Sequence, residues 1–210
     1  RTLGTHLLRE SMVKVGFKGT WIQASAIGIY GNKSQPCDEH TAYGHGFLAQ
    51  VAQAWESAAQ FEKTGPFRLV RMRLGLVLSP KGGTLAKLLP IYKFGLGAPL
   101  ATGEQFMSWI HLDDVIQFVT WVASNPEAEG VYNVVAPQAE TNVSFSRTLA
   151  KALNRPHWAP NVPGFALSLF MGEMASLLLE GQNVTPSKLL SAGFTWKHPH
   201  LPGALQNCTS

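Results

Sequence analysis

The sequence has 210 residues, of which 45% are hydrophobic and 14% are charged. This composition predicts a globular protein with a well-buried core and excludes a disordered chain. The net charge is +4, but no run of basic residues exceeds two, so the sequence lacks the basic stripe of a nucleic-acid-binding protein.

Helices and strands alternate through the first part of the chain. The predicted elements are a helix at 1–15, a strand at 20–25, a polar loop at 30–46, a helix at 47–62 and a strand at 67–78. Apolar residues at helical spacing define the helices, and short apolar runs are typical of buried strands. Arg71 and Arg73 alternate in the last strand, so one of its faces is not wholly apolar. A strand, helix, strand order predicts a parallel sheet with right-handed crossovers.

The same alternation continues to residue 155, where the character of the sequence changes. The further predicted elements are a helix at 84–94, a short strand at 106–111, a helix capped by Asp113 or Asp114 that runs to Ser124, a strand at 130–135 and a helix at 142–154. From Pro156 onward, prolines separate short helices, and residues 193–196 resemble a small edge strand. We therefore expect one domain at 1–155 and a small, mainly helical domain at 156–210.

The cysteines and the apolar runs bear on compartment and partners. Cys37 and Cys208 form no CxxC motif and accompany no paired histidine spacing, so the sequence predicts ordinary thiols and no metal site. Apolar runs such as 165–170 are much shorter than a membrane span. We expect a cytoplasmic protein with no nucleic-acid or membrane partner.

Several motifs occur in the order typical of one superfamily. They are Ala24–Gly31 (ASAIGIYG), Pro36–Glu39 (PCDE), Arg73–Leu78 (RLGLVL), Ser108–Asp114 (SWIHLDD) and Gly130–Val134 (GVYNV). Each resembles a segment of the extended short-chain dehydrogenase/reductases. Residues 47–56, 95–103 and 178–194 are similar to the epimerase-like members with a short C-terminal domain, which are labelled nucleoside-diphosphate-sugar epimerases or cell-division-inhibitor-like proteins. The resemblance implies an α/β fold: the C-terminal part of a Rossmann-like parallel sheet with helices on both faces, followed by the small helical domain.

The resemblance also implies a dinucleotide cofactor, NADP(H) in preference to NAD(H). In the family, a glycine-rich turn in the first βα unit approaches the pyrophosphate. We expect roughly 80–100 residues of this fold to precede Arg1, so that the present chain alone binds a dinucleotide weakly. The cofactor-binding residues that the resemblance implies are Arg1, Ser25, Ala26, Val77 and Leu78. For Arg1, a phosphate contact and a solvent-exposed position at a helix start remain alternatives.

The catalytic residues of the superfamily are a Ser or Thr, a Tyr, and a Lys four residues after the Tyr. An alignment through Glu56 places the Tyr and Lys positions on Leu48 and Ala52, and the Ser position on Ala26, next to Ser25. Leu48 and Ala52 cannot move a proton, so two functions stay open. One is an NAD(P)-dependent epimerase or reductase with a non-standard proton donor, acting on a nucleotide sugar or another small carbonyl or hydroxyl compound. The other is a cofactor-binding protein without catalysis that senses redox state or binds a partner.

Ser25, Tyr30 and His111 are the candidate catalytic residues of the enzyme hypothesis. The alternative for Tyr30 is packing beneath the loop with its hydroxyl satisfied, and the alternative for His111 is a backbone hydrogen bond beside a helix cap.

The candidate substrate residues are Glu39, Lys81, Gln105 and Trp109. Glycines and lysines around residues 80–93 suit a diphosphate at a helix start, or merely turn the chain. Gln105 and Trp109 offer an amide and a flat ring to a sugar or base, with packing against the C-terminal helices as their alternative. The sequence does not indicate an oligomeric state.

Overall fold

The computed structural model describes residues 2–61, 67–165, 169 and 179–210. Its centre is a parallel three-stranded sheet in the order β1, β3, β7. These strands are β1 (Thr20–Ala26), β3 (Arg68–Leu74) and β7 (Gly130–Val134). Thr20 pairs with Arg68 and Ala26 pairs with Leu74, so β1 and β3 run side by side in the same direction. This arrangement confirms the predicted α/β fold with a parallel sheet.

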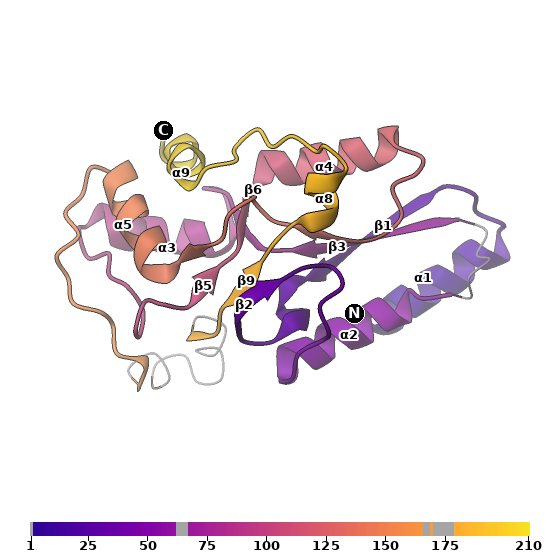
Figure 1. Cartoon of the computed structure of the whole chain (residues 1–210), viewed down its shortest axis with the longest axis horizontal. Helices are drawn as coiled ribbons and strands as arrows, with labels where there is room; N and C mark the ends of the chain where they lie inside the picture. The colour runs from indigo at the N-terminus through magenta and orange to yellow at the C-terminus, as the bar shows by residue number, and fades with distance from the viewer. Residues whose placement is uncertain (1, 62–66, 166–168, 170–178) are drawn as a thin grey trace.

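Helices cover both faces of the sheet, and the two faces differ in chemistry (Figure 1). On one face lie α1 (Thr2–Lys14) and α2 (Phe47–Ala58), and on the other lies α4 (Leu112–Ser124). The face toward α4 is apolar: its core contains Val70, Met72, Tyr132, Val134, Phe118 and Val122. Side chains alternate along a strand, so the opposite face carries Gln23, Ser25, Arg71, Arg73 and Asn133. The predicted alternation of arginines in β3 therefore marks the polar face beneath α2.

The predicted strand at 67–78 is two strands, because the chain changes partners at Gly75. Beyond it, β4 (Leu76–Leu78) pairs in parallel with β6 (Trp109–His111). A Cβ on Gly75 would lie 2.5 Å from the Ser108 carbonyl oxygen and 2.8 Å from Val135 Cγ1, so the close crossing requires glycine. The predicted strand at 106–111 is also two strands, and its break is at Ser108, the residue that lies against Gly75. Its first part, β5 (Phe106–Met107), pairs antiparallel with β8 (Glu140–Thr141).

A second hydrophobic core forms around the short strands. Three helices contribute to it: α3 (Gly83–Lys93), α5 (Asn142–Ala152) and α9 (Leu201–Thr209). Leu201 and Leu205 of α9 lie in the same buried cluster as Trp109 and Leu149, so the C-terminal helix completes this core. In the described part of the chain, no helix has both the length and the apolar character needed to cross a bilayer.

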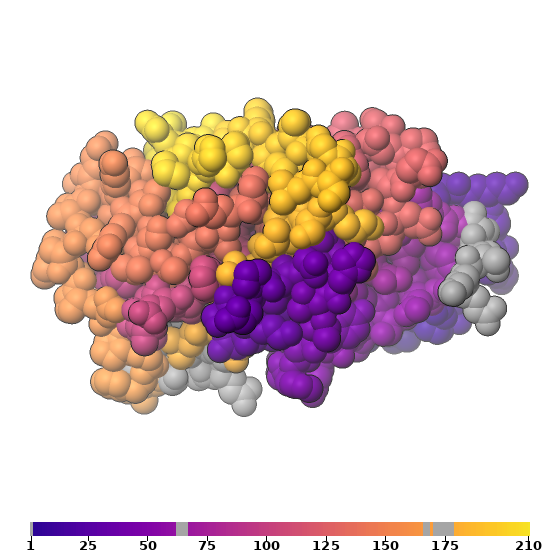
Figure 2. Space-filling model, viewed as in Figure 1, coloured from indigo at the N-terminus to yellow at the C-terminus, as the bar shows by residue number. Residues whose placement is uncertain are grey.

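A parallel pair of short strands brings distant parts of the chain together. β2 (Lys33–Cys37) follows the 3-10 helix η1 (Ile27–Tyr30), within the predicted polar loop, and pairs with β9 (Gln182–Val184). Figure 2 shows gold atoms of the segment before the C-terminal helix lying directly against the dark violet loop that contains β2. After β9 comes the short helix α8 (Ser187–Ser191). The sequence did not indicate this strand pair, because each strand is short and its partner is remote.

Two local predictions are wrong. Residues 193–196 form no strand; Phe194 and Trp196 alternate because both rings pack toward the apolar face of the sheet, and Trp196 Nε1 donates to the Val135 carbonyl oxygen at 3.0 Å. The cap of α4 is His111, not Asp113 or Asp114: His111 Nδ1 accepts the backbone N–H of Asp113 at 3.1 Å.

Candidate functional site

The carboxyl ends of β1, β3 and β7 meet at one edge of the sheet, which is where open parallel α/β sheets bind ligands. Four predicted cofactor-binding residues lie at strand ends: Ser25 and Ala26 in β1, and Val77 and Leu78 in β4. Ala26 is exposed and Val77 is half-buried, whereas Ser25 and Leu78 are buried. The fifth predicted residue, Arg1, lies outside the described residues.

A buried ion pair joins α2 to β3 beneath this edge. The Glu56 carboxylate accepts hydrogen bonds from Arg73 Nε at 2.8 Å and from Arg73 Nη2 at 2.9 Å. Ser25 Oγ donates to the same carboxylate at 2.6 Å. The side chains of Arg73 and Glu56 are only 2% and 4% exposed. Burial alone would lower the pKa of Arg73, but Glu56 raises that pKa above its ordinary value, so the guanidinium stays charged.

The other side of the Arg73 guanidinium holds Tyr30. Arg73 Nη1 donates to the Tyr30 hydroxyl at 2.8 Å, and this hydroxyl donates to Asn133 Oδ1 at 2.7 Å. Burial raises the pKa of Tyr30 to about 12, although Arg73 opposes the shift. The phenol therefore keeps its proton throughout the neutral range. Ser25, Tyr30, Glu56, Arg73 and Asn133, which we call the buried network, link η1 and α2 to all three central strands.

Two of the predicted catalytic residues, Ser25 and Tyr30, are thus members of the buried network. Their hydroxyl groups are hydrogen-bonded to network partners, and Tyr30 takes the position described by its packing alternative. Leu48 and Ala52, at the aligned Tyr and Lys positions, lie on α2; Ala52 is buried, and a Cβ on Gly28 would lie 3.6 Å from Leu48 Cβ. This face of α2 therefore packs closely against η1.

Glu39 clamps β7 to α8. Its Oε1 accepts the backbone N–H of Asn133 at 3.0 Å, and its Oε2 accepts that of Lys188 at 3.3 Å. The Lys188 ammonium in turn lies 4.0 Å from the centre of the Tyr132 ring and donates to the Glu129 carbonyl oxygen at 2.9 Å. Both carboxylate oxygens of this predicted substrate residue are therefore occupied by backbone groups.

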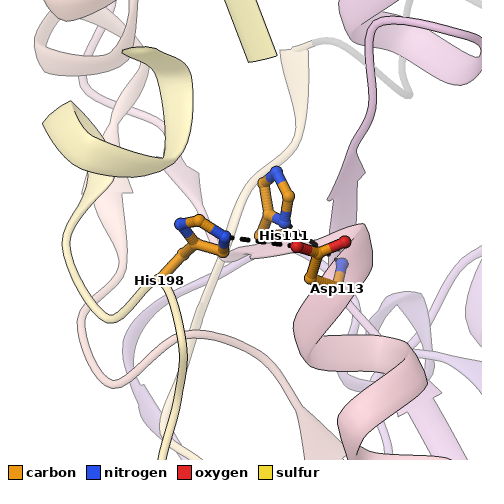
Figure 3. Close-up of side chains that lie close together, drawn as sticks. All are labelled: His111, Asp113 and His198. Carbon is orange, nitrogen blue, oxygen red and sulfur yellow. Dashed lines mark hydrogen bonds and ion pairs between the residues drawn. The ribbon is translucent and has the colours of Figure 1, made fainter. Parts of the chain in front are cut away.

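The third predicted catalytic residue, His111, lies in a cluster with Asp113 and His198 (Figure 3). The centroids of the two imidazole rings are 4.0 Å apart, and His198 Nε2 lies 3.5 Å from Asp113 Oδ2. Burial lowers the pKa of His111, and His198 lowers it further. The fully buried Asp114 accepts the backbone N–H groups of Lys197 at 2.6 Å and of His198 at 3.2 Å, which fixes the C-terminal segment over the start of α4.

The other three predicted substrate residues, Lys81, Gln105 and Trp109, lie in different surroundings. Lys81 is exposed in the loop before α3. Gln105 is half-buried, and its Nε2 donates to the Leu100 carbonyl oxygen at 3.1 Å. Trp109 is 1% exposed and packs in the second core with Leu201, as its packing alternative described.

The sequence did not identify the residues that contact the predicted catalytic side chains. Arg73 carried a usable signal, because an arginine in the middle of a predicted buried strand needs a buried counter-charge. Glu56, the counter-charge, lies 17 residues away on another element, and nothing in its local sequence connects it to Arg73. His198 gave no signal, since nothing in its local sequence connects it to His111.

A parallel sheet with helices on both faces defines a Rossmann-like α/β protein, a class that binds ligands beyond the carboxyl ends of its strands. The sequence matches the NAD dependent epimerase/dehydratase family over residues 1–135, and a domain of unknown function, DUF1731, over residues 162–208. The chain belongs to the NAD dependent epimerase/dehydratase family, which confirms the resemblance inferred from the motifs.

Relatives and solved structures agree with this assignment. Epimerase family protein Mb2239 of Mycobacterium bovis is 38% identical over 213 residues, which cover 100% of this chain and 70% of that protein. The crystal structure of human epimerase family protein SDR39U1 (isoform2) with NADPH matches with a TM-score of 0.92 and 30% identity, covering 99% of this chain and 71% of the human chain. Thermus thermophilus UDP-glucose 4-epimerase in complex with NAD has a TM-score of 0.73 at 21% identity, with 98% and 68% coverage, and shares the fold.

Proposed function

We propose that this protein binds NADP(H), in preference to NAD(H), at the carboxyl ends of β1 and β4, and transfers hydride to or from a small carbonyl or hydroxyl compound. The observation that carries the proposal is the close match, over nearly the whole chain, to the human structure that contains NADPH. Ala26 and Val77 are the predicted cofactor-binding residues with accessible surface, since both lie at strand ends without being fully buried.

In this proposal, the cofactor supplies the hydride and the chain supplies positioning. Ser25 and Tyr30 hold the strand ends rather than move protons, because Glu56 and Arg73 engage their hydroxyl groups and the pKa of Tyr30 lies near 12. The proton donor is then a group other than the usual tyrosine, whose aligned position is Leu48.

The proposed substrate is a nucleotide sugar or a compound of similar polarity. Lys81 supports it, because an exposed ammonium group in the loop before α3 suits a diphosphate. Glu39 and Trp109 would shape the substrate region without touching the substrate, because Glu39 accepts two backbone N–H groups and Trp109 packs in the second core.

The cofactor proposal is tested by titrating the protein, expressed from its complete reading frame, with NADPH and with NADH. We expect NADPH to bind more tightly and Ala26→Trp to weaken binding at least about tenfold, a loss of about 1.4 kcal/mol. Ala123→Trp is the matched control. Ala123 is an exposed alanine, like Ala26, but it lies on α4, across the sheet from α2. Tighter binding of NADH, or unchanged binding in Ala26→Trp, would contradict the proposed site.

A non-catalytic cofactor-binding role is the second candidate, and the apolar residues Leu48 and Ala52 favour it. The two roles separate in a hydride-transfer assay of the same protein with a panel of sugar nucleotides and small carbonyl compounds. Oxidation of NADPH that depends on one of these compounds supports the enzyme. Tight binding of NADPH without turnover of any compound supports the sensor or partner-binding role.

A further inference from the structure

The cluster of His111, Asp113 and His198 combines two imidazoles and a carboxylate at a place that the proposed chemistry does not use. One potential ligand atom from each residue lies within 4.8 Å of the other two. Two of the residues flank the junction of β6 and α4, and the third comes from the segment before α9, so the fold brings them together from distant parts of the sequence (Figure 3).

His198 provides an independent reason to expect a ligand. Its Nε2 is buried and, among the described residues, makes no hydrogen bond of good geometry; only a long ion pair with Asp113 engages it. The nearest charged group is Asp113 Oδ2, at 3.5 Å. A buried polar atom that is weakly hydrogen-bonded is costly, so an imidazole nitrogen with only this long contact has room for a stronger partner.

We propose that His111, Asp113 and His198 bind one borderline divalent metal ion, such as Zn²⁺, which ties the C-terminal segment to the start of α4. Zn²⁺ prefers imidazole nitrogen and carboxylate oxygen, at about 2.0–2.2 Å, in tetrahedral geometry. Ligand atoms in such a site are about 3.3 Å apart, and the His198–Asp113 pair already stands at 3.5 Å. Three protein ligands leave the fourth position for water.

Closing the site disturbs few strong interactions. His111 Nδ1 would give up the backbone N–H of Asp113, a cap bond of about 1 kcal/mol. The Lys197 ammonium, which lies 2.9 Å from Asp113 Oδ2, would move away; its side chain is 62% exposed, so this pair contributes little. Asp114 meanwhile accepts the backbone N–H of His198, which holds this segment beside the start of α4.

The test is a Zn²⁺ titration of the chelator-treated protein by calorimetry, with Co²⁺ absorption as a report on ligand type. We expect one ion per chain with a Kd below about 10 μM, and at least a hundredfold weaker binding in His198→Ala and in Asp113→Asn. The matched control is His6→Asn, because His6 Nδ1 also lies 3.5 Å from a carboxylate, that of Glu10, but on an exposed helix face.

Wild-type protein that fails to bind Zn²⁺ at 100-fold the expected Kd would overturn the proposal, and so would equal binding in wild type and His198→Ala. If both cluster variants fail to fold, the Co²⁺ spectrum of the wild type decides: tetrahedral absorption with nitrogen ligands supports the site, and an octahedral aquo-like spectrum refutes it.

Discussion

Replacing Glu56 by glutamine is the sharpest test of the buried network, because it removes a charge while keeping the shape of the side chain. The substitution leaves the Arg73 guanidinium, which is 2% exposed, without its counter-charge. It also weakens three hydrogen bonds, of 2.6, 2.8 and 2.9 Å, that the carboxylate accepts. Breaking one side of a buried ion pair costs about 3–5 kcal/mol, since the remaining charge is poorly solvated. With a urea dependence of roughly 2 kcal/mol per M, the unfolding midpoint should fall by about 2 M.

The control for this measurement is Glu10→Gln. Glu10 also faces a basic partner, His6, but the two side chains are 57% and 45% exposed, so the substitution should change the free energy of unfolding by less than about 0.5 kcal/mol. The double variant Glu56→Gln/Arg73→Met should lose much less stability than the sum of the two single changes, because no charge remains buried. A loss below about 1 kcal/mol in Glu56→Gln, or additivity in the double variant, would refute the argument that the pair is tightly coupled.

Three further predictions concern stability. Gly75→Ala should lower the free energy of unfolding by about 1–3 kcal/mol, measured in urea, because its Cβ would meet the Ser108 carbonyl oxygen; an unchanged midpoint would show that the crossing relaxes freely. Tyr30→Phe should cost about 1–3 kcal/mol, because it leaves Asn133 Oδ1 and one Arg73 N–H without their partner, and a neutral result would mean that water replaces the hydroxyl. In chelator-containing buffer, stability should fall as the pH drops below about 6.5, since folding lowers the pKa of His111 and the unfolded chain then binds more protons. His198, Asp113 and Asp114 also act on the pKa of this histidine, so the slope should diminish in His111→Gln, and an equal slope in that variant would assign it to another group.

The elements of the fold that depend on local pattern could be predicted from the sequence. The strand at Thr20–Ala26 and the helix α4 carry apolar periodicities that need no knowledge of the partner. The break at Gly75 could not be predicted, because its cause is the approach of Ser108 from a remote segment. The pairing of β2 with β9 was missed for the same reason: its information lies in two segments that meet only in the folded chain.

In the candidate site, too, the sequence indicates which residues are unusual but not which partners give them their roles. The sequence singled out Ser25, Tyr30 and His111 as polar groups at unusual places, and the structure finds all three buried. Their roles depend on partners far along the chain, such as Asn133 for Tyr30 and His198 for His111. A single sequence does not show which distant side chains meet. The catalytic roles of Ser25, Tyr30 and His111 therefore stay predictions.

The polar residues on the face of the sheet beneath α2 help to fix the register of β3 against β1. Arg73 faces Glu56 only while β3 keeps its present register with β1; a slip of one residue would turn the guanidinium toward the apolar face, where Phe118 and Val122 pack. The buried pair therefore opposes a one-residue slip of β3, whatever its contribution to net stability. Ser25 and Asn133 pair with Arg73 from either side, so the same contacts that select the register also fix the carboxyl ends of β1 and β7. Those ends are where a ligand of a parallel α/β sheet binds, and a register error there would displace the predicted cofactor residues by a full strand step.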